Sequence, residues 1–243
     1  IKYSDGVTIA YNYAYNIVQD AFNLSQSSDG YVQHNEAHDI YSENGAIYCY
    51  GTDNISIVGN LVYNVPNNDG IKLGDSGDGS TGGSLSGNTV YNCAQDGITV
   101  YASSVDVLYN EVHTCSSENG AMYLYLSDGS IVRGNIIHDN AAIGLLIHRS
   151  TGVTIEENQI YNNDDFDDTK YAGTAGIWIT DTSTVDTLKG NEIRDNTTVN
   201  LHWDGTGAID ASANWWGTDD PAVVASLLNV NNHYTSEDGS ISE

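Results

Sequence analysis

Basic residues are scarce in this sequence. Seven Lys and Arg face 33 Asp and Glu, which gives a formal charge of −26 and a pI near 4.1. Nucleic acids and anionic membrane surfaces are themselves polyanions, so this balance opposes binding to either. We therefore expect no nucleic-acid partner.

Long apolar runs and helix-forming residues are also missing. No run approaches the roughly 18 apolar residues that a membrane span needs, so we expect no membrane insertion. There are only 2 Pro, 2 Phe and 1 Met, against 25 Gly and 17 Tyr. This composition favours strands and turns over helices, and the 40% hydrophobic content allows a packed core.

A short motif recurs along the chain. Each copy reads Asn-x-(Val/Ile/Ala)-(Tyr/His)-(Asn/Asp), and a glycine follows the asparagine after 9 or 10 residues in most copies. From first to last the asparagines span 202 residues in eight intervals, a mean of about 25. They are Asn12, Asn35, Asn60, Asn88, Asn110, Asn135, Asn158, Asn191 and Asn214.

Each repeat carries three short strand-like segments, too few to bury their own apolar faces. Stacked coil upon coil, they form a continuous core. The sequence therefore predicts an all-β, right-handed, single-stranded parallel β-helix of about nine coils. The asparagine side chains would bond from coil to coil, and asparagine tolerates the left-handed backbone of a turn.

The two ends differ. The β-helix is predicted over residues 1–218 and a cap helix with a tail over 219–243, with Asp220 as N-cap and Pro221 opening a helix that runs to Leu228. Trp215 and Trp216 are expected to seal the last coil. No amphipathic helix covers the first coil, and an open sheet edge invites further pairing. We therefore expect self-association through the N-terminal coil, or sequence upstream of it.

Two stretches carry a resemblance to a known family. Gly59 to Asn64 (GNLVYN) and Gly134 to Asp139 (GNIIHD) resemble the parallel β-helix repeat of carbohydrate-binding proteins and sugar hydrolases. The ending from Ala213 to Thr218 (ANWWGT) is similar to the last coil of archaeal and bacterial surface β-helix proteins, among them the methanogen disaggregatase. The resemblance implies the fold and an extracellular or cell-surface location. It transfers no catalytic residue, because no pectin-hydrolase signature is matched.

Strand alternation after each glycine sorts side chains into inward and outward rows. Counted in this way, Tyr48 and Tyr123 point inward, whereas Ile47 and Met122 point outward. The outward face gathers the residues that a polysaccharide enzyme needs. His148, Arg149 and Asp181 are the catalytic candidates, since His and Asp move protons and Arg neutralises a uronate carboxylate. The expected substrate-binding residues are Trp178, Lys72, Tyr101, His202 and Asp204.

Two insertions interrupt the repeat. The first, residues 74–83, contains Asp75 and Asp78, and its carboxylates and carbonyls suit Ca²⁺, although it lacks the EF-hand ligand pattern. The second, residues 164–171, places four Asp around Phe166. It is either another Ca²⁺ loop, a cleft wall or a solvated acidic loop.

A further row follows each ladder asparagine by three residues and contains mostly Tyr and His. Its stacked rings are either a sugar-binding track, a contact surface or a device that stabilises the coil stack. His113 and His138, in adjacent coils, are also a candidate metal pair. Cys93 and Cys115 occupy equivalent positions in adjacent coils, so they form either a disulfide or a rung of buried thiols.

Two functions follow from these features. The first is cleavage of an extracellular polysaccharide that contains uronate, by hydrolysis or by β-elimination, with Ca²⁺ bridging the carboxylates. The second is a structural role as a surface-layer, sheath or adhesin building block. A non-catalytic sugar-binding module on a larger protein is not separated from the first by the sequence.

Overall fold

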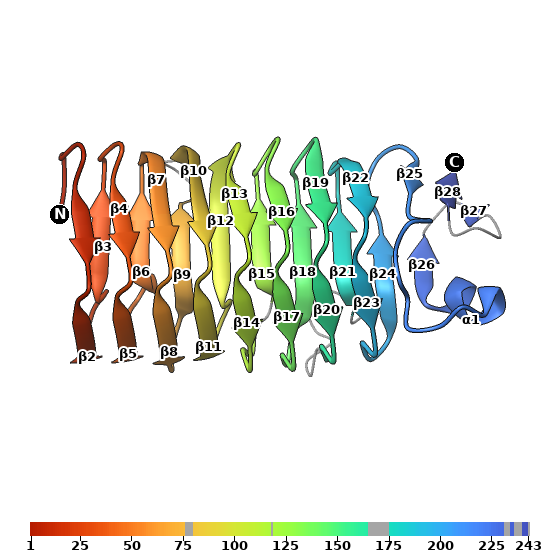
Figure 1. Cartoon of the computed structure of the whole chain (residues 1–243), viewed down its shortest axis with the longest axis horizontal. Coiled ribbons are helices and arrows are strands. Elements are labelled where there is room, and N and C mark those ends of the chain that lie inside the picture. Colours follow the sequence, from red (N-terminus) through yellow and green to blue (C-terminus); the bar gives the residue numbers. More distant parts are fainter. Residues whose placement is uncertain (76–79, 118, 165–174, 231–233, 236–239, 243) are drawn as a thin grey trace.

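The chain folds into a parallel β-solenoid whose strands run in three columns along one axis (Figure 1). This computed structural model describes residues 1–75, 80–117, 119–164, 175–230, 234–235 and 240–242. We call the columns sheet A, sheet B and sheet C. Strand β10 pairs with strands of both sheet A and sheet B, so these two form one hydrogen-bonded sheet of 17 strands, and sheet C has eight.

The strands pair in parallel with their counterparts in the next coil. Sheet A contains β3 (Phe22–Ser25), β6 (Gly45–Tyr50), β9 (Asp69–Gly74), β12 (Ile98–Ser103), β15 (Gly120–Tyr125), β18 (Ile143–His148), β21 (Ala175–Thr180), β24 (Val199–Trp203) and β26 (Leu228–Val230). Sheet B contains β1 (Thr8–Ala10), β4 (Tyr31–Gln33), β7 (Asp53–Val58), β10 (Ser80–Ser86), β13 (Asp106–Leu108), β16 (Ile131–Arg133), β19 (Val153–Glu156) and β22 (Val185–Lys189). Sheet C contains β2 (Tyr13–Ile17), β5 (Glu36–Ile40), β8 (Leu61–Val65), β11 (Thr89–Cys93), β14 (Glu111–His113), β17 (Ile136–His138), β20 (Gln159–Tyr161) and β23 (Glu192–Arg194).

The predicted asparagine ladder is confirmed in full. Each side-chain amide nitrogen, from Asn12 to Asn191, donates to the Oδ1 of the next ladder asparagine over 2.8–3.0 Å. The same Oδ1 atoms accept from the backbone N–H of the asparagine before them, as Asn135 does from Asn110. Because the amides from Asn35 to Asn191 are buried, each of these rungs satisfies polar groups that would otherwise destabilise the fold.

The core follows the alternation of sheet C. Val62, Val90, Val112, Ile137 and Ile160, two residues after their asparagines, are fully buried. In the first coil, by contrast, Val7, Ile9 and Ile17 pack against the core while remaining partly exposed. Cys93 and Cys115 lie in adjacent coils as buried free thiols, and Cys49 is a third.

Two strands depart from the predicted alternation. Gly45 pairs with Asp69, and Gly120 with Ile143, so each of these glycines lies one residue earlier in its coil than the other turn glycines do. Ile47 and Met122 are therefore in the core, fully buried. Tyr48 and Tyr123 fall on the outer side, and the prediction that they point inward is wrong.

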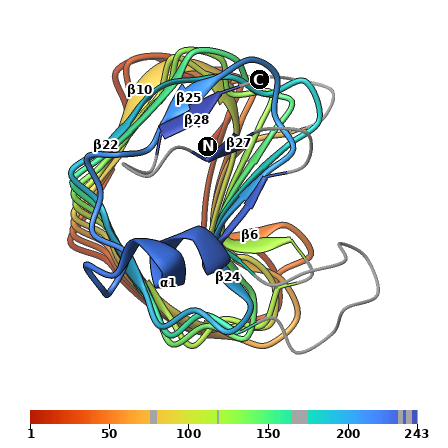
Figure 2. The same cartoon turned by 90° about the vertical axis from the view of Figure 1, so that its right-hand side faces the viewer.

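The C-terminal end carries one short helix. Helix α1 (Pro221–Ser226) begins as predicted, with the Asp220 carboxylate accepting from the Ala222 N–H, and it lies across the end of the coil stack (Figure 2). It stops before Leu228, which instead joins β26 and pairs with Leu201. Trp216 is buried in the core as expected, whereas Trp215 is 47% exposed and does not seal it.

A small antiparallel sheet joins β25 (Ile209–Asp210), which precedes the helix in the chain, to β27 (Tyr234–Thr235) and β28 (Ser240–Ser242), which follow it. Among the described residues, no helix is long and apolar enough to cross a membrane.

Candidate active site

The outer face of sheet A carries two rows of side chains in register. The first row is Tyr48, Lys72, Thr99, Tyr123, Leu146, Trp178 and His202. The second row includes Gly74 and Tyr101, which pair with each other, and further along Tyr125, His148 and Thr180. The face therefore mixes rings, charges and apolar side chains over seven coils.

The three predicted catalytic residues meet at one point. His148 closes β18, and Arg149 follows it with a left-handed φ of 51°. The Oδ2 atom of Asp181, in the next coil, lies 2.8 Å from His148 Nε2 and 3.1 Å from Arg149 Nε. A carboxylate only accepts, so Nε2 carries a proton, and in the neutral imidazole Nδ1 is the basic nitrogen.

Two tyrosines complete this group: Tyr123, which the alternation had wrongly turned inward, and Tyr125. Arg149 donates from NH1 to the Tyr125 hydroxyl over 3.2 Å. The Tyr123 hydroxyl lies 3.4 Å from His148 Nδ1, and the Tyr125 ring meets the His148 ring edge to face. Both tyrosines belong to β15, whose shifted alternation is what turns them outward.

The contacts within this group keep Asp181 and Arg149 ionised. Burial raises the pKa of Asp181, but hydrogen bonds from Arg149 and His148 outweigh it, so that pKa lies below its usual range. Hydrogen bonds to Tyr125 and Asp181 raise the pKa of Arg149. Asp181 is therefore an ionised orienting group, and Arg149, whose side chain is 55% exposed, is a permanent cation facing solvent.

Trp178, His202 and Asp204 lie together but are mostly covered. The Trp178 and His202 rings stack with centroids 4.4 Å apart, and the indole N–H donates to Asp204 Oδ2 over 3.1 Å. His202 Nε2 lies 2.9 Å from the same carboxylate oxygen. Trp178 and His202 are each 5% exposed, and Trp178 packs with Leu146 and Tyr123 in a second apolar cluster outside the main core.

Lys72 and Tyr101 lie at the other end of the face with Tyr48. The Lys72 ammonium is 5.6 Å from the Tyr48 ring centre and 5.5 Å from that of Tyr101, and 3.8 Å from Asp75 Oδ1. The Tyr48 hydroxyl donates to Asp75 Oδ2 over 2.7 Å. Burial raises the pKa of Tyr101 to about 12, so this phenol stays protonated.

The predicted Ca²⁺ loop is only partly described. Asp75 takes part in the contacts above, whereas Asp78 lies outside the described residues, as does most of the second insertion (165–174). Within the described part of the chain, no three His, Cys, Asp or Glu side chains are placed to hold a metal ion.

Two buried carboxyls escaped the sequence analysis. Asp69 and Asp96 occupy equivalent positions in adjacent coils and are 5% and 2% exposed. The Asp96 N–H donates to Asp69 Oδ1 over 3.2 Å, while Asp96 itself accepts from Thr99, Ser117 and Asn119. Burial raises both pKa values, and the neighbouring carboxylate raises that of Asp69 further.

The predicted ring row on sheet C forms a continuous stack, with neighbouring ring centres 4.7–5.7 Å apart and near-parallel planes. The Arg194 guanidinium lies 4.7 Å from the centre of the last ring, Tyr161. In order the row is Tyr15, His38, Tyr63, Tyr91, His113, His138, Tyr161 and Arg194. The rings cover one another's faces. His113 and His138 are stacked members of this row. Ring-on-ring stacking is the arrangement expected of a row that stabilises the coil stack.

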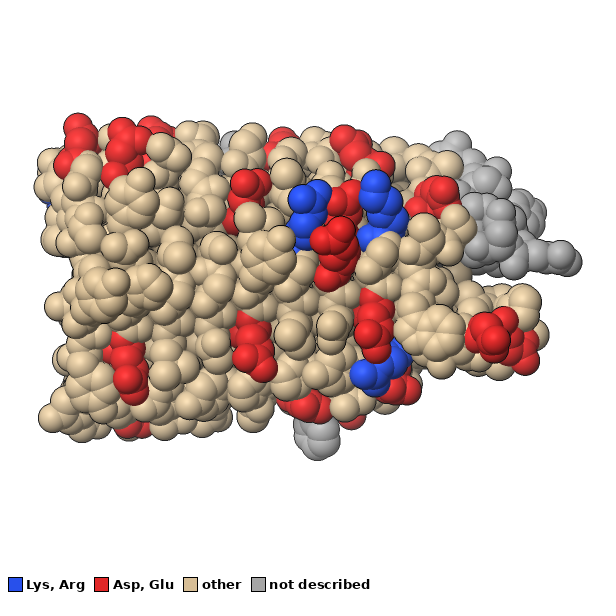
Figure 3. All heavy atoms as spheres, viewed as in Figure 1, with Lys and Arg blue, Asp and Glu red and all other residues tan. Residues whose placement is uncertain are grey.

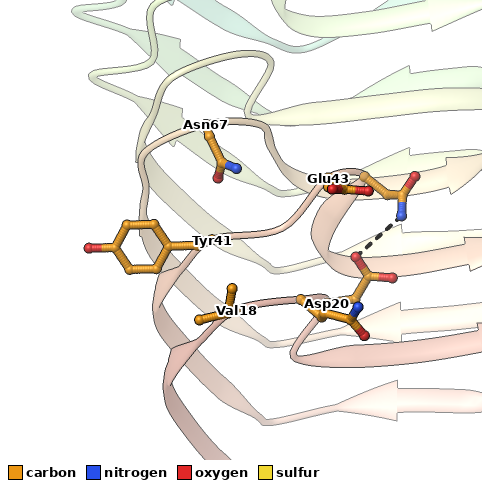
Figure 4. Close-up of a pocket in the computed structure, with 7 residues that line it drawn as sticks. Val18, Asp20, Tyr41, Glu43 and Asn67 are labelled. Atoms are coloured by element: carbon orange, nitrogen blue, oxygen red, sulfur yellow. Dashed lines mark hydrogen bonds between the residues drawn. The ribbon is translucent and has the colours of Figure 1, made fainter.

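Two pockets lie at the turns between sheets C and A. One, of about 360 Å³, is lined by Asp20, Glu43 and Tyr41, with Val18 and Asn67 at its rim (Figure 4). The other, of about 370 Å³, is lined by Tyr41, Asp39 and Pro66 among others. Both lie away from His148, and neither gathers the contacts found on the outer face of sheet A.

The opposite side of the molecule shows how the few cations are used. The view in Figure 3 faces sheets B and C, and its basic side chains lie over the C-terminal half beside acidic ones. They form ion pairs: Arg133 and Lys189 both with Glu156, and Arg194 with Glu192. Arg149, which pairs with Asp181, lies instead at the end of a sheet A strand, away from these three cations of sheets B and C.

The fold and this face define a right-handed β-helix protein with its polar and aromatic groups on the outer side of one sheet. The chain belongs to the right-handed β-helix family, whose model matches residues 45–215. Comparison of the sequence with curated proteins gives no match.

Several solved structures share the fold. A mutant of the periplasmic alginate epimerase AlgG has 15% identity and a TM-score of 0.57, over 91% of this chain and 49% of that one. PfbA, a surface adhesin of Streptococcus pneumoniae, has 10% identity and a TM-score of 0.56, over 99% and 74%. DFA-IIIase from Arthrobacter chlorophenolicus A6, in complex with GF2, has 14% and 0.52, over 85% and 54%. This chain spans about half the length of the epimerase.

Proposed function

We propose that this protein cleaves a uronate-containing polysaccharide at the outer face of sheet A, outside the cytoplasm or at the cell surface. The observation that carries the proposal is the group formed by His148, Arg149 and Asp181 together with Tyr125. It places a base, a fixed cation and a phenol within contact of one another. The likeness to a periplasmic alginate epimerase and to a surface adhesin supports the substrate class and the location.

The groups suit β-elimination. Arg149 pairs with the uronate carboxylate and makes the neighbouring C5 proton more acidic. His148 takes that proton at Nδ1, and Asp181 stabilises the resulting imidazolium. The C5–H electron pair forms the C4=C5 double bond as the C4–O bond breaks. Tyr125 accepts from Arg149 and so has its own O–H to protonate the leaving oxygen. The proton held on His148 then passes through water to the Tyr125 phenolate, which restores both groups.

Hydrolysis fits this group less well. A glycosidase needs one carboxylic acid that holds a proton and a second carboxylate on the other side of the bond. Arg149 and the His148 N–H both bind Asp181, and its lowered pKa keeps it ionised at neutral pH, so it is a poor proton donor. We therefore favour elimination over hydrolysis for this site.

The test is a digestion panel of alginate, pectate, chondroitin and neutral glycans, with Ca²⁺ and with a chelator. We expect a product that absorbs in the ultraviolet as an unsaturated uronate. New reducing ends without that absorbance would replace elimination by hydrolysis. Dependence of the rate on Ca²⁺ would support Ca²⁺ as a cofactor. No product on any glycan would overturn the enzymatic proposal.

A structural role is the alternative, and the unbroken ring stack of sheet C is the observation that favours it. Such a rod could build a sheath or surface layer, with self-association through the N-terminal coil, where Val7 and Ile9 are partly exposed. Linear arrays in electron micrographs together with an inactive panel would favour this role. A monomer at high concentration would count against it.

A further inference from the structure

Two nine-residue segments, three coils apart, are identical at seven positions. Residues 42–50 read SENGAIYCY and residues 117–125 read SENGAMYLY. These two segments contain the two shifted strands, β6 and β15, described above. Each begins at a turn and ends on a tyrosine pair that points out of sheet A, Tyr48 with Tyr50 and Tyr123 with Tyr125.

The two copies are built in the same way. In the first, the Ser42 hydroxyl donates to Asp20 of the preceding coil and accepts from the Asn44 N–H over 2.9 Å. In the second, the Ser117 hydroxyl donates to Asp96 and accepts from the Asn119 N–H over 2.8 Å. The turn is therefore fixed to the coil before it by the same contacts, and both tyrosine pairs lie on the outer side of sheet A.

Each tyrosine pair meets a cation and a carboxylate from the following coils. At the second copy, Arg149 bridges Tyr125 and Asp181. At the first copy, Asp75 accepts from Tyr48 and lies 3.8 Å from the Lys72 ammonium. The two groups share their chemistry but differ in exposure: Arg149 is the exposed cation of one, at 55%, whereas the Lys72 side chain is 17% exposed and Asp75 is 40%.

One position separates the two copies decisively. His148 lies one coil beyond Tyr125, and Gly74 lies at the matching position one coil beyond Tyr50. A Cβ atom on Gly74 would lie 2.1 Å from the Tyr101 carbonyl oxygen, and the backbone φ of Gly74 is +83°. No imidazole fits there. The first copy repeats the tyrosine scaffold without the base.

We propose that Tyr48, Lys72 and Asp75 form a non-cleaving subsite that binds another sugar residue of the same polysaccharide, three coils from His148. This inference rests on the proposed function. Three coils span about 14 Å, because neighbouring strands lie about 4.8 Å apart. The spacing between two strands is close to the length of one pyranose in an extended chain, so three coils correspond to about three sugar residues. A bound chain then reaches both groups only when it has about four residues or more.

The chemistry of the subsite indicates what it recognises. An exposed carboxylate accepts hydrogen bonds from sugar hydroxyls and repels a uronate carboxylate. Lys72 is mostly covered and already faces Asp75, so it offers little to a second anion. The subsite therefore takes a sugar residue through its hydroxyls, whereas Arg149 takes the uronate.

The test measures binding without cleavage, in the His148→Ala variant. Alginate and chondroitin oligosaccharides from disaccharide to octasaccharide are titrated calorimetrically. We expect Asp75→Asn to weaken octasaccharide binding about tenfold, the loss of one or two polar contacts, and to leave disaccharide binding unchanged. Asp186→Asn, at an exposed aspartate of sheet B, is the control and should change neither. Equal unfolding midpoints for all variants would exclude a general loss of structure.

The outcomes separate the two proposals. Equal affinity for short and long oligosaccharides in both series, or no effect of Asp75→Asn on the octasaccharide, would overturn the subsite even if the unmodified protein cleaves polysaccharide. Binding that depends on length and on Asp75, in a protein that cleaves nothing, would overturn the proposed reaction and retain the subsite.

Discussion

The outer faces of sheets C and A are built from the same coils but differ in order. On sheet C, one ring stacks on the next from Tyr15 to Tyr161, and every ring is that of a Tyr or a His. On sheet A, Lys72, Thr99, Tyr123 and Leu146 follow one another in a single row. In a regular row, each side chain takes its neighbours in the row as its contact partners.

An irregular row brings unlike groups together, and that is what chemistry requires. His148 and Arg149 of one coil meet Asp181 of the next because the two coils carry unlike residues there, whereas identical neighbours would only stack. Sheet C and the asparagine ladder therefore provide rigidity, and sheet A uses that rigidity to hold a site. The predictions below test this division, from the largest effect to the smallest.

The ladder should be the most sensitive element. Asn110→Ala removes the amide that donates to Asn135 and to the Leu85 carbonyl and that accepts from Asn88. Because the partners left behind are buried, we expect a loss of about 3 kcal/mol in the free energy of unfolding, measured by chemical denaturation. The exposed Asn67→Ala serves as control, and an equal effect of the two variants would contradict the role of the ladder.

The ring stack should matter to stability and not to activity. Tyr91→Ala removes the contacts with Tyr63 and His113, whose ring centres lie 5.0 and 4.9 Å away. Two aromatic contacts of this kind amount to about 1–2 kcal/mol of unfolding free energy. Turnover on the polysaccharide should be unchanged at a temperature where the variant is folded. A large fall in turnover would mean that sheet C is part of the binding surface.

A buried carboxyl of sheet A should lower the free energy of unfolding at neutral pH. Burial and the neighbouring Asp96 raise the pKa of Asp69 well above its usual range. A carboxyl whose folded pKa exceeds its unfolded one stabilises the fold below the unfolded pKa, and this contribution is lost as pH rises through the folded pKa. Asp69→Asn should therefore be more stable than the parent at neutral pH, with the difference shrinking toward pH about 4.

Thermal unfolding of the Asp69→Asn variant across that pH range provides the measurement. The exposed Asp186→Asn should follow the parent curve at every pH. A variant that is less stable than the parent at neutral pH would show that the ionised Asp69 carboxylate is well accommodated, and that sheet A does not carry this cost.

The surface ion pairs of sheet B should matter least. Lys189→Ala removes one of two cations on Glu156, and the Lys189 side chain is 62% exposed. We expect a change of less than about 1 kcal/mol in unfolding free energy, reduced further by added salt. A larger, salt-independent effect would place Glu156 among the structural elements of the coil stack.

The repeating parts could be predicted well from the sequence because each coil carries the same residue types at equivalent positions. Nine asparagines at intervals that average about 25 residues defined the ladder, and the alternation around them placed the sheet C rings correctly. The site was harder to predict, because it depends on departures from the repeat. The glycines that open β6 and β15 lie one residue earlier in their coils than the other turn glycines, so alternation counted from them is reversed and hid Tyr48 and Tyr123.

Burial was the second thing that strand alternation did not predict. Outward positions were expected to be accessible, yet Trp178 and His202 stack on one another and are 5% exposed. The buried Asp69 and Asp96 precede turn glycines, where alternation assigns no direction. The duplicated SENGA segments were the signal that could have exposed the shifted strands, since an identical turn recurs with the same outward tyrosines.

A matched pair of histidine variants tests the central claim most directly. His148 lies on sheet A and His113 on sheet C, and the two variants His148→Ala and His113→Ala are compared for formation of unsaturated uronate from the polysaccharide that the unmodified protein cleaves. We predict that His148→Ala lowers turnover by about 100-fold or more, as expected for the loss of a general base, and that His113→Ala keeps it. Full activity in His148→Ala, or an equal loss in both variants, would contradict the assignment of the chemistry to sheet A.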